Sequence, residues 1–238
     1  MRVNFPISET KEPFLSILES ALKNRDATDP VLDLSKERLG KRDIEELETM
    51  IRLLSTKLGS GLRVANLANT GLQLKPASEL VKMVAAFEGT EISKLILSSN
   101  FLCKLPANEF KEVLMTVAKN SKITDIDLSS NGLSAYGIET LKSILPLLNQ
   151  PHIDKVWLGG NRFDKAAGAY EMADLLYDAL GSRAMLEDTD EFSQTMARQI
   201  AQRSQANDQK TPRLVVTDKA TLLSQEESER PVNSLKAF

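Results

Sequence analysis

Apolar and polar residues alternate along this chain in a pattern that recurs five times. Three segments align without gaps: ISKLILSSNFL at 92–102, ITDIDLSSNGL at 123–133 and IDKVWLGGNRF at 153–163. Each fits L-x-x-L-x-L-x-x-N-x-L, and two weaker copies precede them, DPVLDLSKERL at 29–39 and LRVANLANTGL at 62–72. The polar site of this pattern falls at residues 37, 70, 100, 131 and 161, so its period is 33, 30, 31 and 30 residues.

Every copy predicts a short strand that leads into a helix. The alternating apolar residues are typical of a strand buried on one face, and the segment after each copy has helical spacing. Such units in series predict a parallel sheet covered by helices on one side. The residues that predict the helices are Ile44, Leu47, Ile51 and Leu54; Leu80, Val81 and Val84; Phe110, Leu114 and Val117; Ile138, Leu141 and Leu145; and Tyr170, Ala173 and Leu180.

The asparagines at the polar site follow a strand where the chain turns. Asn100, Asn131 and Asn161 occupy it in the three strong copies. An amide both accepts and donates hydrogen bonds, so it can join the backbones of neighbouring coils, and buried polar groups must be paired. We therefore expect these asparagines to be structural.

The pattern resembles that of the leucine-rich repeat family. Repeats of about 30 residues with a helical second half are similar to its ribonuclease-inhibitor type, and the resemblance covers about residues 29–180. It implies an α/β solenoid, a short horseshoe with a parallel β-sheet on the concave face, helices on the convex face and a helical cap at each end.

The segments outside the repeats predict these caps. Residues 1–28 contain one amphipathic helix and read as an N-terminal cap in front of the five repeats at 29–180. The helix is marked by Phe14, Leu15, Leu18 and Leu22.

The C-terminal region divides into a cap, at residues 181–223, and a flexible acidic tail, at 224–238. Asp188 and Glu191 resemble a capping box that opens a helix. Phe192, Met196 and Ile200 lie on one face of that helix, and the β-branched run RLVVT at 213–217 predicts a strand at the sheet edge.

Composition excludes several functional classes. With 30 basic and 33 acidic residues and a net charge of −3, the chain has no basic excess for a primary nucleic-acid binder. No apolar run approaches the roughly 20 residues that span a bilayer, and the first ten residues contain no signal-peptide core. A single cysteine suits a reducing compartment, so we expect a cytoplasmic protein.

Catalytic residues are scarce. Cys103 follows one strand and His152 precedes another two repeats away, so the two lie at opposite sheet edges, roughly 20 Å or more apart, and form no dyad. Asp125 and Asp127 share a strand face, but two carboxylates on an open sheet form a poor acid–base site and a better negative binding patch. We predict no catalytic residue, no cofactor and no metal.

The solvent face of the predicted sheet is the candidate site. Trp157, the only tryptophan, lies on this face, and tryptophan is enriched at binding hot spots. The alternative is that the C-terminal segment covers it. Ile96 provides a second anchor, and charged residues provide polar specificity. The predicted partner-binding residues are Trp157, Ile96, Lys94, Asp125, Asp127, Lys155, Asn66 and Asp33 on the sheet, with Phe101 and Arg162 on the adjoining loops.

We therefore expect a non-enzymatic module that binds a protein partner through its concave face. The resemblance to ribonuclease inhibitor implies that an enzyme partner would be inhibited by blocked access. A scaffold that recruits a second component through its helical C-terminal segment is the alternative. A metal-dependent enzyme that uses Asp125 and Asp127 is the weakest hypothesis.

The C-terminal sequence suggests an origin. The tail SQEESERPVNSLKAF, with Glu226, Glu227 and Glu229, is similar to the glutamate-rich signals of effectors that intracellular bacteria export by type IV secretion. This resemblance implies an effector delivered into a host cell cytosol, although acidic tails also serve solubility.

Overall fold

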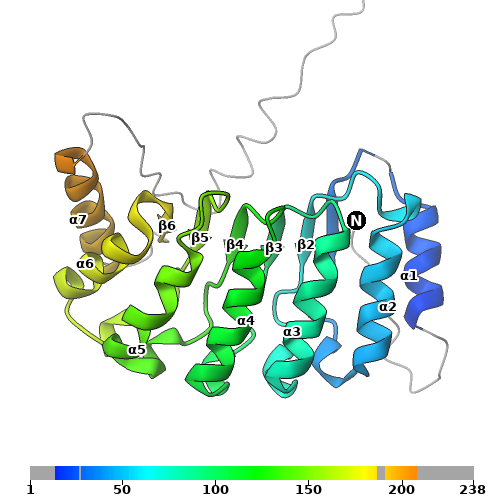
Figure 1. Ribbon diagram of the computed structural model, residues 1–238, viewed down its shortest axis with the longest axis horizontal. Helices are drawn as coiled ribbons and strands as arrows, with labels where there is room; N and C mark the ends of the chain where they lie inside the picture. Colours follow the sequence, from blue (N-terminus) through cyan, green and yellow to red (C-terminus); the bar gives the residue numbers. More distant parts are fainter. Residues whose placement is uncertain (1–13, 27, 187–190, 208–238) are drawn as a thin grey trace, which may run out of the picture.

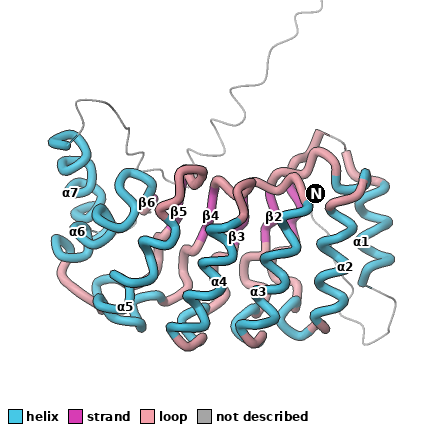
Figure 2. Tube along the Cα trace, in the orientation of Figure 1, coloured by secondary structure: helices cyan, strands magenta, loops and turns pink. Residues whose placement is uncertain are grey.

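Each repeat forms a three-residue strand, a turn and a helix in the computed structural model, which describes residues 14–26, 28–186 and 191–207 (Figure 1). The strands form one layer and the helices another (Figure 2). The helices are α1 Phe14–Lys23, α2 Ile44–Leu54, α3 Ala77–Ala86, α4 Ala107–Lys119, α5 Gly137–Ile144, α6 Ala169–Leu180 and α7 Glu191–Asn207. The strands are β1 Val31–Asp33, β2 Val64–Asn66, β3 Lys94–Ile96, β4 Asp125–Asp127, β5 Lys155–Trp157 and β6 Ala184–Met185.

Short 3₁₀ turns complete each coil. One set follows the strands: η1 Leu39–Lys41, η3 Leu72–Leu74, η5 Leu102–Lys104, η6 Leu133–Tyr136 and η8 Phe163–Lys165. The other set comes before the next strand: η2 Lys57–Gly59, η4 Phe87–Gly89, η7 Leu145–Leu148 and η9 Gly181–Arg183.

The six strands found among the described residues are parallel and adjacent in chain order, from β1 to β6. Strands pack about 4.8 Å apart and helices about 8–10 Å apart, so the sheet lines the inner, concave face of the curve. The edge strand β6 was not predicted, because two residues are too short to show a period. The strand predicted at 213–217 lies outside the described residues.

The core lies between the sheet and the helices. The middle residue of each three-residue strand, from Leu32 in β1 to Val156 in β5, points into it, as does Ala184 of β6, and none of these is more than 1% exposed. The helices contribute the predicted apolar face, with one exception. Tyr170, which the spacing assigned to that face, is 64% exposed because it begins α6 and turns outward.

Buried asparagines join consecutive coils, as the sequence predicts. The Oδ1 of Asn131 accepts hydrogen bonds from the backbone N–H of Asn100 (3.0 Å) and of Leu102 (3.3 Å) in the preceding repeat. Its Nδ2 donates to the carbonyls of Leu97 (3.1 Å) and Leu128 (3.0 Å). Asn100 and Asn161 make the equivalent bonds, so the three amides form a continuous ladder.

A helix packs against the repeats at each end. In α1, Phe14, Leu18 and Leu22 are buried, and the Arg42 guanidinium lies 3.9 Å from the Phe14 ring centroid.

At the other end, α7 packs on α6 and buries Met196 and Ile200, as predicted. Arg203 fastens α7 to α6 through Asp174 (2.8 Å) and Asp178 (2.9 Å). No helix in the described part of the chain is long and apolar enough to cross a membrane.

Replacing a ladder amide should destabilise the whole solenoid. Asn131→Ala leaves two buried backbone donors without an acceptor, and we expect the free energy of unfolding to fall by about 3 kcal/mol. Chemical denaturation measures this change. Asn108→Ala, on the exposed start of α4, is the matched control and should change it by less than about 0.5 kcal/mol. An equal effect of both substitutions would contradict the role of the ladder.

Candidate functional site

The sheet register aligns the predicted surface residues into two rows on the concave face. The rows cross the strands at right angles, so neighbouring members lie about 4.8 Å apart. The first row is Val31, Val64, Lys94, Asp125 and Lys155, and the second is Asp33, Asn66, Ile96, Asp127, Trp157 and Met185. The register thus brings together the eight predicted sheet residues.

Three members of the second row have a structural role that sequence reasoning missed. The Oδ1 of Asp33, Asn66 and Asp127 accepts the backbone N–H two residues further on, at 2.9, 3.1 and 2.8 Å. This bond holds the turn at the end of the strand. The recurrence of Asp or Asn at one position of the motif could have indicated this turn-forming role. Only the second oxygen or the amide nitrogen of these side chains is left to face a partner.

Ile96 and Trp157 break this pattern at the same row position. They replace the turn-forming side chain with large apolar groups that make no equivalent bond. Trp157 is half-buried, not fully exposed, and the Lys94 Nζ lies 5.7 Å from its ring centroid. Because Lys94 is on β3 and Trp157 on β5, the two side chains approach one another above β4. The indole Nε1 is buried and has no hydrogen-bond partner among the described residues.

The charges of the concave face are not paired. Lys94, Asp125 and Lys155 are neighbours in one row, yet neither they nor Asp127 form an ion pair with another described residue. The Oδ2 of Asp125 accepts instead from the Thr124 hydroxyl, at 2.8 Å.

Some charges on other faces are paired. Hydrogen bonding to Arg63 holds the pKa of Glu91 below its usual value, and the Glu139 carboxylate raises the pKa of Lys142.

The fold places Cys103 and His152 in different repeats and at different ends of their strands. Cys103 lies after β3, next to Gly132 of the following repeat, whereas His152 precedes β5. Nearby, Tyr136 donates its hydroxyl hydrogen towards the carbonyls of Leu102 (2.8 Å) and Leu105 (3.0 Å), and its burial raises its pKa. Among the residues that the structure describes, no three His, Cys, Asp or Glu side chains are grouped to hold a metal ion.

Comparison with solved structures decides the fold. The leucine-rich repeat-containing protein LegL7 from Legionella pneumophila superposes with a TM-score of 0.64 and 20% sequence identity. The match covers 82% of this chain and 60% of the LegL7 chain, so the present chain spans less than two thirds of the length of that chain. This chain has the leucine-rich repeat fold. No protein-family model and no curated protein sequence matches it.

Within this leucine-rich repeat fold, the two predicted loop residues have a left-handed backbone conformation, which Lys36, Asn69, Ser99 and Ser130 also adopt in their own loops. Phe101 and Arg162 follow the ladder asparagine with φ of 50° and 57°, in the left-handed region. Gly71 and Gly132 occupy the same place in the second and fourth repeats, where glycine adopts this conformation without strain. A phenylalanine there costs about 1–2 kcal/mol, yet its ring is 52% exposed.

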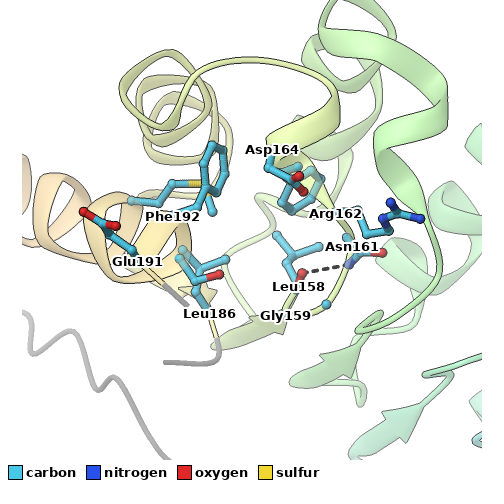
Figure 3. A pocket seen from close by; sticks show the side chains of 12 residues that line it. Leu158, Gly159, Asn161, Arg162, Asp164, Leu186, Glu191 and Phe192 are labelled. Carbon is cyan, nitrogen blue, oxygen red and sulfur yellow. Dashed lines mark hydrogen bonds between the residues drawn. The ribbon is translucent and has the colours of Figure 1, made fainter. Parts of the chain in front are cut away.

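A cavity of about 450 Å³ lies where the last leucine-rich repeat meets α7. Leu186 and Phe192 line one side, Leu158 and Asp164 the other, and Arg162 points away (Figure 3). Residues 187–190, which connect β6 to α7, are outside the described residues. We assign no ligand to this cavity.

The hydrogen bond that Asp127 accepts in the turn and the charge of its carboxylate can be tested separately. Asp127→Asn keeps an oxygen that accepts from Ser129, as Asn66 does in its own repeat, and should leave stability unchanged. Asp127→Ala removes that acceptor and should lower the free energy of unfolding by about 1 kcal/mol. Urea denaturation of the two variants tests this, and equal stabilities would show that the bond contributes nothing.

The strain at Phe101 can be measured by comparing two truncations. Phe101→Gly and Phe101→Ala both remove the ring, but only glycine accepts the left-handed backbone, so the glycine variant should be more stable by about 1 kcal/mol. Thermal unfolding of both variants measures the difference. At Lys104, whose φ is negative, the order should reverse because glycine loses more chain entropy. Equal stability of the Phe101→Ala and Phe101→Gly variants would show that the backbone at position 101 is not strained.

Proposed function

We propose that this chain is a non-enzymatic module that binds a protein partner through its concave face. One observation supports this above all: Ile96 and Trp157 stand where the other repeats place turn-forming Asp or Asn. They serve neither the core nor the turn, and unpaired charges surround them. Apolar anchors within a polar surround are typical of interface hot spots.

The charge pattern would fix how a partner is aligned on the surface. Lys94, Asp125 and Lys155 alternate in sign across three neighbouring strands, at a spacing of about 4.8 Å. A partner with the opposite alternation would pair with all three, whereas a displaced partner would meet like charges. Ile96 and Trp157, in the adjacent row, would then be covered and lose their remaining contact with water.

Occlusion is the mechanism that follows. A curved sheet grips a convex partner surface, and an enzyme held in this way is inhibited because its substrate cannot reach it. This part of the proposal draws on the sequence resemblance to the ribonuclease-inhibitor type.

The biological setting that we propose is a bacterial effector delivered into a host cell. The fold shared with a Legionella pneumophila protein supports a bacterial origin. The glutamate-rich tail that carries the type IV secretion resemblance lies outside the described residues, so this part rests on sequence.

The scaffold hypothesis has less support. A recruiting helix needs an unpartnered face, but α7 already buries Met196 and Ile200 against the solenoid. Arg203 uses both of its terminal nitrogens on α6. The exposed residues described on α7 are polar: Glu191, Arg198, Gln202 and Gln205.

The double variant Ile96→Ser/Trp157→Ala tests the concave face. We expect partner capture from a cell lysate, measured by cross-linking and quantitative mass spectrometry, to fall by about ten-fold or more, because both anchors are lost. Thermal unfolding should change little, since neither side chain belongs to the buried core.

Tyr170→Ala is the matched control. It removes a large aromatic side chain that is 64% exposed on the helical side, and capture should persist. Undiminished capture by the double variant would exclude the concave face as the binding surface.

A further inference from the structure

The loops that follow the strands are stacked as regularly as the strands. Hydrogen bonds continue between them: Lys36 N–H donates to the Ala68 carbonyl (2.9 Å), Asn69 N–H to Ser98 (2.9 Å) and Ser99 N–H to Ser129 (3.0 Å). Ser130 N–H donates likewise to Gly159 (2.8 Å). Equivalent residues in neighbouring loops are therefore separated by about the strand spacing of 4.8 Å.

Two positions of this loop alternate between odd and even repeats. The odd repeats, 1, 3 and 5, carry long side chains at both, whereas the even repeats carry glycine at the first and leucine or alanine at the second. The first position reads Arg38, Gly71, Phe101, Gly132 and Arg162, and the second, three residues on, reads Lys41, Leu74, Lys104, Ala135 and Lys165. We name the six odd-repeat residues the loop ridge.

The loop ridge is exposed and positively charged. Arg38, Lys41, Lys104 and Arg162 are exposed and form no ion pair with another described residue, whereas Lys165 pairs with Asp164 (3.2 Å). This is notable in a chain whose net charge is −3.

The middle of the ridge combines the apolar ring of Phe101 with the charge of Lys104. Phe101 is 52% exposed, Leu74 beside it is 59% exposed, and the Lys104 Nζ lies 5.5 Å from the Phe101 ring centroid. The ridge therefore matches a partner with carboxylates at two ends and an apolar side chain between them.

The spacing selects the secondary structure of that partner. Odd repeats are two strands apart, or about 9.6 Å. Seven residues of an α-helix rise about 10.5 Å and return to the same helix face. In a strand, side chains on one face recur at about 6.6 and 13.2 Å, which fits poorly.

We infer that the loop ridge binds an acidic α-helix of a partner protein, laid along the solenoid. An apolar residue of its middle heptad contacts Phe101. Carboxylates one heptad before and after it pair with Arg38 and Lys41 at one end, and with Arg162 and Lys165 at the other. This surface adjoins the concave rows, and the inference does not depend on the proposed function.

A designed peptide tests the inference with the full chain. The probe is a fluorescein-labelled helical peptide of three heptads, with leucine in the middle heptad, glutamates at the equivalent site of the outer heptads, and alanine and glutamine elsewhere. Fluorescence anisotropy measures its affinity. Replacing the glutamates by glutamine, or moving them to the opposite helix face, should weaken binding by about ten-fold or more.

Protein variants locate the binding site. Arg162→Glu and Phe101→Gly should each weaken probe binding by about ten-fold, and glycine keeps the loop conformation. Lys119→Glu, the same charge change on the exposed end of α4, should have no effect. Trp157→Ala should also have none, which separates a failure here from a failure of the concave-face proposal.

Four outcomes would overturn the inference. Equal affinity for the peptides with glutamates on the two helix faces would show that the heptad spacing does not matter. Equal losses of probe affinity in Lys119→Glu and Arg162→Glu would show that only net charge matters. Tighter probe binding after Glu226, Glu227 and Glu229 are all changed to Gln would make the chain's own tail the occupant. Stronger ridge-dependent binding of a single-stranded oligonucleotide would make it a nucleic-acid site.

Discussion

The asparagine ladder is the constraint on which the rest of this structure depends. A three-residue strand must turn at once, and the turn is buried, so its backbone groups cannot be hydrated. Each ladder amide accepts two N–H groups from the preceding coil and donates to carbonyls of both coils. This bonding fixes the distance between repeats as well as their register. Backbone hydrogen bonds between strands and between loops extend the same regular spacing to the first repeat, which contributes no asparagine to the ladder.

A regular framework changes how its exceptions are interpreted. In the second concave row, Asp33, Asn66 and Asp127 perform the same turn function, so their recurrence is structural. Ile96 and Trp157 stand out because they abandon that function. In the loops, glycine is the unstrained choice, and Phe101 and Arg162 stand out because they are not glycine. Departures from the repeat, more than the repeat itself, single out the surfaces that we propose for binding.

Much of the fold could be predicted because the same pattern of apolar and polar residues occurs five times along the chain. The strands, the helices α2 to α6 and the buried asparagines follow from apolar spacing alone. The edge strand β6 could not be found, since two residues carry no period. Tyr170 was assigned to an apolar face because spacing does not distinguish the first turn of a helix from its middle. For the candidate site, the sequence predicted which residues share a face but not the turn bonds that occupy three of them.

The sequence by itself determined the repeat, the strand faces and the scarcity of catalytic side chains, because these depend only on residue type and spacing. Tertiary structure decided which charges remain unpaired, since that depends on distances between repeats. It also decided that Trp157 is half-buried with Lys94 close to its ring. The stacking of the loops likewise aligns the odd repeats into one ridge. Such properties arise between side chains about 30 or 60 residues apart in sequence, and only the stacking of coils brings those side chains together.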